Sequence, residues 1–375
     1  MSGSSRRRWY AGTLGLLLGL GCLARCASVA PRPAGVGSAA SDARKACEGL
    51  DALEPLEASN RWAQLERLDC LLDGGELASA AALVGEMGDR FGDERELMKA
   101  LSDRLTRLIQ THGQLSDLPA RLRLEDSSLP VPTVQASVAG RQGLLIWDSG
   151  SESSALDRAL CSRLGLQRIG RGEVVDSTRQ VEEGNYIALL SEPIDLGSVR
   201  MDLPTVFCID LGHVVAQEPR FIGILGANAL NISAYQINLA RKELTLGAVS
   251  SGAFVTLDAT FQNGLPRVRG EVDGRGVDFL LDTGADFSVL SNSTIEALGL
   301  EARASGESRT TQEAGGQREE SDLRVLLPQL DLGNEVRASM EMRTGGTDIL
   351  GLDFIGNRTL FVDRERGVVG LSPIP

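Results

Sequence analysis

The sequence contains an internal repeat, and both copies are centred on an acidic triplet. The first copy has Asp148-Ser149-Gly150 and the second has Asp282-Thr283-Gly284. A Leu-Gly-Leu segment begins sixteen residues after each of these aspartates, at 164–166 and at 298–300. Two copies that align without a gap imply two structural units of one kind, so the repeat predicts a chain with paired halves.

After residue 122 the sequence changes to short β-rich runs separated by turn residues. These runs lie at 134–138, 143–147, 186–190, 205–209 and 244–246 in the first unit, and at 267–272, 277–281, 323–327, 338–342 and 368–371 in the second. Helices are expected chiefly at 156–164 and 294–298. We therefore expect two all-β lobes, 122–249 and 250–375, joined at the Ser- and Gly-rich residues 250–252.

Net charge and histidine content exclude several classes of function. The formal net charge is −13, and no basic stripe offsets this acidity after the first residues, which argues against a nucleic-acid partner. The two histidines, His112 and His213, leave almost nothing for a Ser-His-Asp triad or a histidine-rich zinc site. We expect neither a metal nor an organic cofactor.

Residues 1–22 have the pattern of an export signal. Arginines at 6–8 precede an apolar, glycine-rich run that ends at Cys22 and is too short for a lasting membrane span. The residues before Cys22 fit a permissive bacterial lipoprotein signal, so we expect lipidation of Cys22, with cleavage after Ala30 as the alternative. Residues 23–41 are rich in Ala, Pro, Gly and Ser and predict a flexible tether.

A third shared element completes each unit, as Ile224-Leu225-Gly226 and as Ile349-Leu350-Gly351. With the triplets and the Leu-Gly-Leu segments, it makes residues 125–373 resemble the aspartic proteases, specifically bacterial members similar to retropepsin with two lobes fused as in pepsin. The resemblance implies a mainly β, bilobal fold, a pseudo-dimer of β-barrel lobes. It also implies flap hairpins, and it makes Gly226 and Gly351 the glycines that thread beside the active-site loops.

The triplets suit acid–base chemistry. An apolar strand that ends in Asp148 or Asp282 delivers a carboxyl to a poorly hydrated place, which favours its protonated form. Gly150 and Gly284 have no Cβ, so each loop can approach the opposite carboxyl. Two such carboxyls share one proton, and the pair can activate a water for attack on a peptide carbonyl. We therefore predict Asp148 and Asp282 as the catalytic residues.

The neighbours of the two aspartates are predicted to support the loops. Ser149 and Thr283 carry hydroxyls suited to hydrogen bonds with the opposite loop, which would lock the halves together. The first copy continues with Ser151 where the second has Ala285. If the Ser151 hydroxyl donates to the outer carboxyl oxygen of Asp148, this aspartate becomes the more readily ionised member of the pair.

Three further features are interpreted from their positions. Polar segments at 312–317 and 176–180 are candidate flap tips, with ordinary exposed hairpins as the alternative. Cys161 and Cys208 are a candidate disulfide. Trp147, which precedes the first aspartate, is expected to fill the core rather than contact substrate.

Residues 42–121 show helical periodicity and predict a small N-terminal helical domain, with Cys47 and Cys70 as a second candidate disulfide. An alternative role is a pro-segment that covers a catalytic cleft until it is removed. This segment has 16 Asp and Glu against 10 Lys and Arg, whereas the pro-segments of pepsin-like enzymes tend to be basic. Charge pairing with an acidic cleft therefore does not favour that role.

Together these patterns predict an exported, lipid-anchored bacterial aspartic endopeptidase of the periplasm or outer membrane, with a polypeptide substrate. Because both half-sites lie in one chain, the catalytic unit is expected to be monomeric. The helical domain is a candidate site for a protein partner, no nucleic acid is expected to bind, and membrane contact is expected only through the lipid anchor. The alternative is a non-catalytic peptide-binding or scaffold module that retains the fold.

Overall fold

The computed structural model describes residues 67, 71, 77–90, 120–171, 184–190, 192–203, 205–229, 234–247, 254–262, 264–305, 308–313, 316–321 and 323–373. Several predictions lie outside these residues: the export signal 1–22, the tether 23–41, Cys22, the pair Cys47 and Cys70, the segment 176–180 and the joint 250–252. None of the described helices combines the length and the apolar character needed to cross a bilayer.

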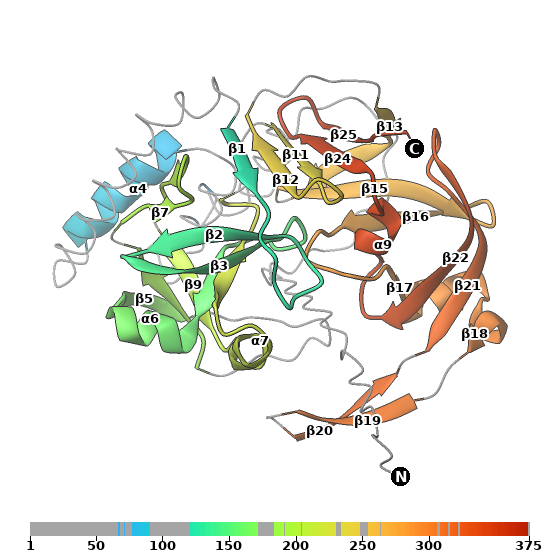
Figure 1. Ribbon diagram of the computed structural model, residues 1–375, viewed down its shortest axis with the longest axis horizontal. Coiled ribbons are helices and arrows are strands. Elements are labelled where there is room, and N and C mark those ends of the chain that lie inside the picture. Colours follow the sequence, from blue (N-terminus) through green and yellow to red (C-terminus); the bar gives the residue numbers. More distant parts are fainter. Residues whose placement is uncertain are drawn as a thin grey trace, which may run out of the picture.

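The first lobe is built on a nine-stranded sheet with the order β5-β6-β9-β4-β10-β3-β2-β7-β8 (Figure 1). Its strands are β2 (Thr133–Val138), β3 (Arg141–Trp147), β4 (Ala155–Asp157), β5 (Gln167–Arg171), β6 (Tyr186–Leu189), β7 (Ile194–Asp195), β8 (Arg200–Met201), β9 (Thr205–Ile209) and β10 (Phe221–Leu225). Two short helices accompany this sheet, α6 (Arg158–Leu164) and α7 (Gly212–Gln217).

The second lobe is built on an eight-stranded sheet with the order β14-β15-β16-β23-β17-β22-β21-β18. Its strands are β14 (Ala259–Gln262), β15 (Leu265–Val272), β16 (Arg275–Leu281), β17 (Val289–Ser291), β18 (Ala304–Ser305), β21 (Arg324–Asp331), β22 (Val336–Gly345) and β23 (Ile349–Leu350). The helices here are α8 (Asn292–Leu298), α9 (Leu352–Ile355) and the 3-10 turn η2 (Glu301–Arg303). An additional pairing of β15 with β21 curls this sheet toward a barrel.

A third sheet joins the lobes, and each lobe contributes three of its six strands. Its order is β1-β12-β11-β24-β25-β13, and it lies at the top of the molecule in Figure 1. The strands are β1 (Ala120–Arg123), β11 (Ala234–Asn238), β12 (Glu243–Leu246), β13 (Val255–Leu257), β24 (Thr359–Asp363) and β25 (Val368–Leu371). This shared sheet was not predicted, because a sequence repeat defines equivalent strands without saying that they pair with each other.

The central pairing of the shared sheet is symmetric. Strand β11 runs antiparallel to β24, with Ala234 opposite Asp363 and Asn238 opposite Thr359. The repeat makes Ala234 equivalent to Thr359 and Asn238 equivalent to Asp363, so exchanging the lobes reproduces the same pairs. A surface that pairs with its own copy in this way has two-fold symmetry, and the two lobes form the predicted pseudo-dimer.

The described part of the N-terminal region is a single helix, α4 (Leu77–Arg90), together with residues 67 and 71. Ala80, Leu83, Val84 and Met87 are buried along one face, at the spacing of an amphipathic helix. Strand β1 pairs with β12 of the first lobe and begins at Ala120, so the predicted boundary between residues 121 and 122 falls inside this strand.

The repeated sequence segments correspond to repeated turns. The repeat also contains a Gly-Arg pair before each aspartate, at 140–141 and 274–275, and these pairs mark two-residue hairpin turns, β2–β3 and β15–β16. Both turn residues have positive φ in each case, 47° and 75° at Ala139 and Gly140, and 51° and 74° at Asp273 and Gly274. These are type I′ turns, whose twist matches that of the strands they connect.

The Leu-Gly-Leu segments end the two matched helices. Helix α6 begins after Asp157 and α8 after Ser291, whose side chains accept backbone N–H groups of the first helical turn. Each helix ends at a left-handed glycine, Gly165 with φ 62° and Gly299 with φ 68°. The next leucine donates its N–H back into the helix at 3.1 and 3.0 Å, which completes a Schellman cap. The predicted helices 156–164 and 294–298 are thus present, with starts shifted by two residues.

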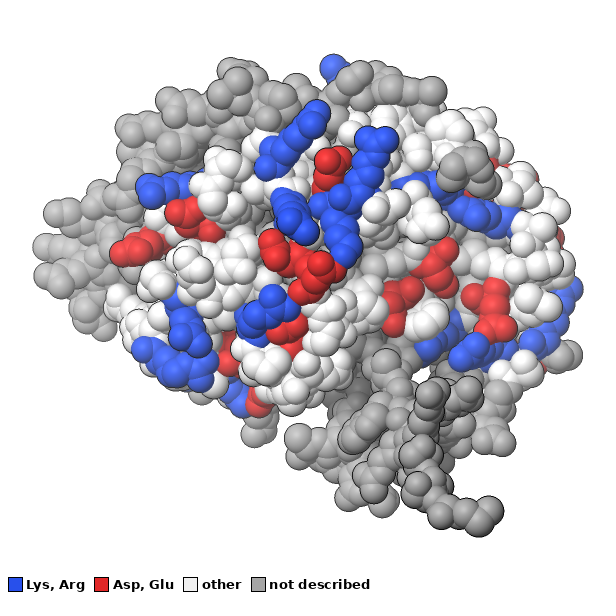
Figure 2. All heavy atoms as spheres, viewed as in Figure 1, with Lys and Arg blue, Asp and Glu red and all other residues white. Residues whose placement is uncertain are grey.

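One apolar core runs through both lobes and the shared sheet. Strand β15 alternates buried and exposed residues in its second half, whereas β3 is buried along its last five residues, 143–147. On the face seen in Figure 2, basic and acidic side chains are interspersed. Ion pairs between described residues include Arg303 with Asp273 at 2.7 Å and Arg220 with Glu218 at 2.9 Å.

Candidate active site

Two equivalent strands deliver Asp148 and Asp282 to the interface between the lobes. Strand β3 ends one residue before Asp148 and lies parallel to β10, and β16 ends one residue before Asp282 and lies parallel to β23. The backbone N–H of each aspartate donates to the neighbouring strand, to Leu225 O and Leu350 O, at 3.0 Å in both lobes. The predicted Ile-Leu-Gly segments are these neighbouring strands.

The residues after the aspartates hold the two loops together. Ser149 N donates to Thr283 Oγ1 at 3.0 Å, and Thr283 N donates to Ser149 Oγ at 3.0 Å. The two hydroxyls then donate into the opposite lobe, Ser149 Oγ to Leu281 O at 2.8 Å and Thr283 Oγ1 to Trp147 O at 2.7 Å. All four bonds are buried and cross between the lobes, so neither loop can move without breaking contacts to the other.

The two glycines lie directly against the opposite carboxyl groups. A Cβ on Gly150 would stand 2.3 Å from Asp282 Cγ, and one on Gly284 would stand 2.6 Å from Asp148 Cγ. Each glycine also donates its N–H to the aspartate of its own loop, at 2.8 Å for Asp148 Oδ1 and 2.7 Å for Asp282 Oδ1. Every side chain larger than hydrogen would push the facing carboxyl away.

The two carboxyls lie close together and are buried, and each residue is only 2% exposed. Burial is the largest cause that raises the pKa of both groups. The negative charge of Asp282 raises the pKa of Asp148 further, whereas N–H groups of Gly284 and Ala285 oppose the rise in the pKa of Asp282. The two carboxyls therefore titrate as a pair, and their closeness disfavours ionisation of both at once.

Ser151 does not make the contact that was predicted from the sequence. Its hydroxyl donates to Ser153 O at 2.9 Å, and only its backbone N–H reaches Asp148. In the second lobe the backbone N–H of Ala285 reaches Asp282 in the same way. The hydroxyl at position 151 thus gives Asp148 no advantage in ionisation, and the inequality expected between the carboxyls does not arise from this residue.

The threading glycines pass close to the active-site loops in both lobes. A Cβ on Gly226 would lie 2.6 Å from the carbonyl of Ser153, and one on Gly351 would lie 2.7 Å from the carbonyl oxygen of Phe287. The residue after each glycine donates its N–H to the loop, to Ser151 O at 2.7 Å and to Ala285 O at 2.9 Å. These contacts fix the loop carrying each aspartate to the neighbouring strand.

A second pair of side chains, which the sequence reading missed, supports this packing. Ser154 donates its N–H and its hydroxyl to Asn228 Oδ1 at 2.7 and 2.8 Å, and Ser288 makes the same bonds to Asp353 Oδ1 at 2.9 and 2.6 Å. The serine hydroxyls accept the N–H of the threading glycine at 3.0 Å in both lobes. The sequence repeat could have indicated these pairs. A serine lies six residues after the aspartate of each triplet, and Asn or Asp lies two residues after each threading glycine.

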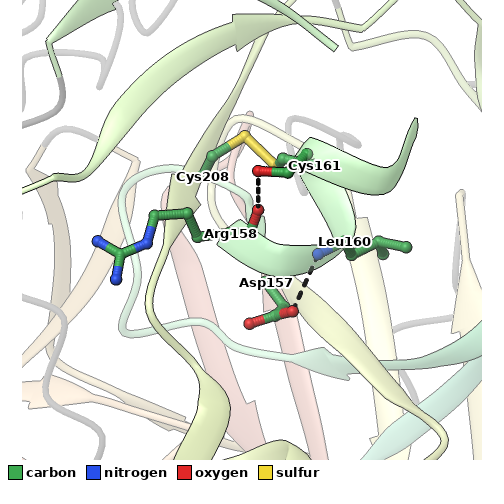
Figure 3. The surroundings of a disulfide bond; sticks show 6 residues. Asp157, Arg158, Leu160, Cys161 and Cys208 are labelled. Carbon is green, nitrogen blue, oxygen red and sulfur yellow. Dashed lines mark hydrogen bonds between the residues drawn. A yellow bond between two sulfur atoms is a disulfide. The ribbon is translucent and has the colours of Figure 1, made fainter. Parts of the chain in front are cut away.

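The cysteines and the tryptophan of the first lobe lie outside the pair of carboxyls. Cys161 on α6 and Cys208 on β9 form a disulfide (Figure 3). A cavity of about 400 Å³ beside α6 is lined by Arg158, Tyr186 and Asp210, and its lining includes neither carboxyl. Trp147 is fully buried in the core, as predicted.

One of the two candidate flaps is a hairpin in the described structure. Strand β19 (Ser308–Glu313) pairs with β20 (Gly316–Ser321) as a separate two-stranded sheet, which extends at the bottom of Figure 1. The predicted tip 312–317 is therefore the end of a hairpin, and its role as a flap stays a prediction. Among the described residues, no cluster of three His, Cys, Asp or Glu side chains could hold a metal ion.

The sheets, the symmetric pairing and the facing triplets define a bilobal acid-protease fold, which confirms the predicted fold class. A family model described as gag-polyprotein putative aspartyl protease matches residues 268–357, which include the second triplet and its threading glycine. Among solved structures, basic 7S globulin from soybean is similar at 12% identity and a TM-score of 0.39, over 68% of this chain and 96% of that one. No curated protein sequence matches the chain.

Proposed function

We propose that this protein is an aspartic endopeptidase, and one observation carries the proposal. Two buried carboxyls from equivalent loops lie close together, and crossed hydrogen bonds between the lobes hold the loops in place. In such a pair one carboxyl is ionised and the other is protonated, so a base and an acid stand side by side. The match of the second lobe to an aspartyl-protease model supports the same class of chemistry.

The proposed reaction is the hydrolysis of a peptide bond. The ionised carboxyl takes a proton from a water molecule while the water oxygen attacks the peptide carbonyl carbon. The protonated carboxyl donates its proton to the carbonyl oxygen, which gives a tetrahedral intermediate. A proton then passes to the peptide nitrogen, the C–N bond breaks, and a carboxylic acid and an amine are released. The raised pKa of the pair keeps one proton available for this exchange.

The decisive test is cleavage of a mixed peptide library by the full chain between acidic and neutral pH. We expect cleavage by the wild type and its loss in both Asp148→Asn and Asp282→Asn. Asp278→Asn is the matched control, because Asp278 is exposed on β16 only four residues before Asp282. Binding of peptides without cleavage, unchanged in the two active-site variants, would instead identify a peptide-binding or scaffold module.

We further propose that the enzyme is a bacterial envelope protein, exported and anchored through a lipid on Cys22. The basic start and apolar run of residues 1–22 motivate this proposal. The disulfide between Cys161 and Cys208 supports it, because disulfides persist in oxidising compartments outside the cytoplasm. Mass spectrometry of the mature protein should find an N-terminal lipidated Cys22, and an unprocessed Met1 would overturn the proposal.

A further inference from the structure

A cavity of the first lobe, separate from the two carboxyls, lies between α6 and the connection from β9 to β10. Its volume is about 400 Å³, which is within the range of small-ligand sites. Helix α6 provides Arg158 and Arg163 to its wall, β6 provides Tyr186, and the connection provides Asp210 and Val215. The cavity therefore combines charged groups of both signs with an aromatic ring and an aliphatic side chain.

The connection that forms one wall of this cavity is longer in the first lobe than in the second. It covers residues 210–220 and contains α7, whereas the equivalent connection of the second lobe, from β22 to β23, covers residues 346–348. This short connection places Asp348 against α8, where its carboxyl accepts Ser291 N at 2.6 Å and Thr294 Oγ1 at 2.7 Å. The fold that the two lobes share therefore does not itself require the wall formed by residues 210–220.

A disulfide and an ion pair hold the two walls of the cavity together. Cys161 on α6 is bonded to Cys208 on β9, two residues before Asp210 (Figure 3). Arg158 Nη2 contacts Asp210 Oδ2 at 2.7 Å. The second lobe has Ile295 in place of Cys161, so it cannot form the equivalent disulfide. The walls are thus joined by a link that only the first lobe carries.

Arg163 and Asp157, which both line the cavity, each keep a charge that the described residues do not pair. Arg163 is exposed and forms no ion pair with another described residue. Asp157 is 6% exposed, and one of its carboxyl oxygens accepts the N–H of Leu160 at 3.0 Å. The other oxygen accepts no hydrogen bond from the described part of the chain. The cavity therefore offers one cation and one anion to a ligand.

The spacing of these two charges favours a short peptide over a free amino acid. Asp157 and Arg163 are six residues apart along α6, which corresponds to about 9 Å of helix axis. An extended chain covers about 3.3–3.6 Å per residue, so about three residues separate its termini by this distance. In a free amino acid both charges are attached to one Cα, which is too short a separation.

We propose that this cavity is a binding site for a short peptide of about three residues with free termini. Arg163 binds the C-terminal carboxylate, because a guanidinium can hold a carboxylate through two parallel N–H···O bonds. Asp157 binds the N-terminal ammonium, and Tyr186 and Val215 contact the side chains between the termini. The site goes beyond the proposed hydrolysis and does not depend on it.

The test uses L-trialanine with free termini, titrated calorimetrically into the full chain carrying Asp148→Asn, in which the proposed hydrolysis cannot consume the peptide. We expect saturable binding at one site per chain. N-acetyl-trialanine and trialanine amide each lack one terminal charge. Each should bind about tenfold more weakly, the usual loss for a hydrogen bond to a charged group. Absence of trialanine binding at millimolar concentration would overturn the site.

Two variants test which residue binds each terminus. Arg163→Gln should bind trialanine about tenfold more weakly and trialanine amide unchanged. Asp157→Asn, which keeps a side chain that can cap α6, should remove the difference between trialanine and its acetylated form. Arg141→Gln is the matched control, because Arg141 is an exposed arginine at the start of β3 and does not line the cavity. It should leave all three affinities unchanged.

Unchanged trialanine affinity in Arg163→Gln would overturn the proposal, as would equal binding of the free and blocked peptides. Equal competition by inorganic phosphate would also overturn it, because the cavity would then bind anions in general. Arg163 is exposed, so its variant decides the question even where Asp157→Asn fails to fold. Cleavage and peptide binding are separate measurements, so failure of the proposed function and failure of this site are distinguishable.

Discussion

At the scale of single residues, the absence of a side chain at two positions is as important as the carboxyls themselves. Gly150 and Gly284 let each loop backbone contact the opposite aspartate, and a Cβ at either position would overlap a carboxyl group. The site therefore depends on a close approach that only glycine permits at these two positions.

We expect Gly150→Ala to lower the free energy of unfolding by about 1–3 kcal/mol, the usual cost of overpacking, and to abolish peptide cleavage. The new methyl group would displace Asp282. Gly276→Ala on β16 is the control, because its nearest contact would be an ordinary 3.6 Å to Arg269 Nη2. Urea unfolding of both variants measures the difference, and equal losses would contradict the explanation.

The two carboxyls should also make stability depend on pH. Their pKa values are raised in the folded state, so above about pH 4 the folded protein binds more protons than the unfolded chain does. Stability contributed by these groups is then lost as the pH rises through the folded-state pKa. Asp148→Asn should therefore flatten the fall in unfolding free energy between pH 4 and pH 7. Urea unfolding across this range measures the free energy of unfolding. If its pH dependence in Asp148→Asn is parallel to that in Asp278→Asn and the wild type, the prediction is refuted.

At the scale of secondary-structure elements, the disulfide joins α6 to β9 across a sequence separation of 47 residues. Asp157 caps the same helix by accepting the N–H of Leu160 at 3.0 Å (Figure 3). The start of this helix and its attachment to the sheet are thus fixed independently. Both connections support the segment that follows the first active-site loop.

Replacing Cys161 and Cys208 together by serine should lower the free energy of unfolding by about 2–4 kcal/mol, because the unfolded chain is no longer constrained. The helix itself should persist, since its cap remains. Ser162→Ala on the same helix is the control, with an expected change within about 0.5 kcal/mol. Thermal and urea unfolding measure both variants, and equal stability of the double serine variant and wild type would be inconsistent with this role.

The elements that the sequence predicts well are those defined by local signals. The turns before each aspartate, the helix ends at Gly165 and Gly299 and the strands around them follow from residue type and spacing. The pairs Ser154–Asn228 and Ser288–Asp353 join residues 74 and 65 positions apart. Their partners depend on how β10 and β23 lie against the loops, and residue types alone do not determine that arrangement.

The prediction for the Ser151 hydroxyl was wrong for the same reason, because residue types alone do not determine hydrogen-bond partners. Ser151 was assigned to the Asp148 carboxyl because it is close in sequence, yet its hydroxyl donates to Ser153 O two residues further on. A short polar side chain often bonds its own loop in this way. Tyr235 shows the converse, because its ring contacts Trp147 from a strand far along the chain and no local signal marks it.

At the scale of the whole molecule, the lobes share one core, one sheet and one set of crossed hydrogen bonds. Strands β11 and β24 lie at the centre of the shared sheet, so neither lobe completes this sheet alone. This arrangement differs from two domains connected only by a linker.

We therefore expect residues 120–373 to unfold in a single cooperative transition. Calorimetry of the full chain should give equal calorimetric and van't Hoff enthalpies for the transition of this unit. Hydrogen exchange should show the amides of β11 and β24 opening together with the same free energy. Two transitions, one for each lobe, would mean that the shared sheet does not couple them.

The symmetric pairing of β11 with β24 has the geometry of a dimer interface, yet both partners belong to one polypeptide. A dimer of identical chains must carry every substitution twice, once in each half of its site. Here Trp147 and Tyr235 occur once, where the second lobe has Leu281 and Leu360, which two identical subunits could not achieve. Because the two halves belong to one chain, one half can carry residues that the other lacks, and the buried packing behind the two aspartates differs between the lobes.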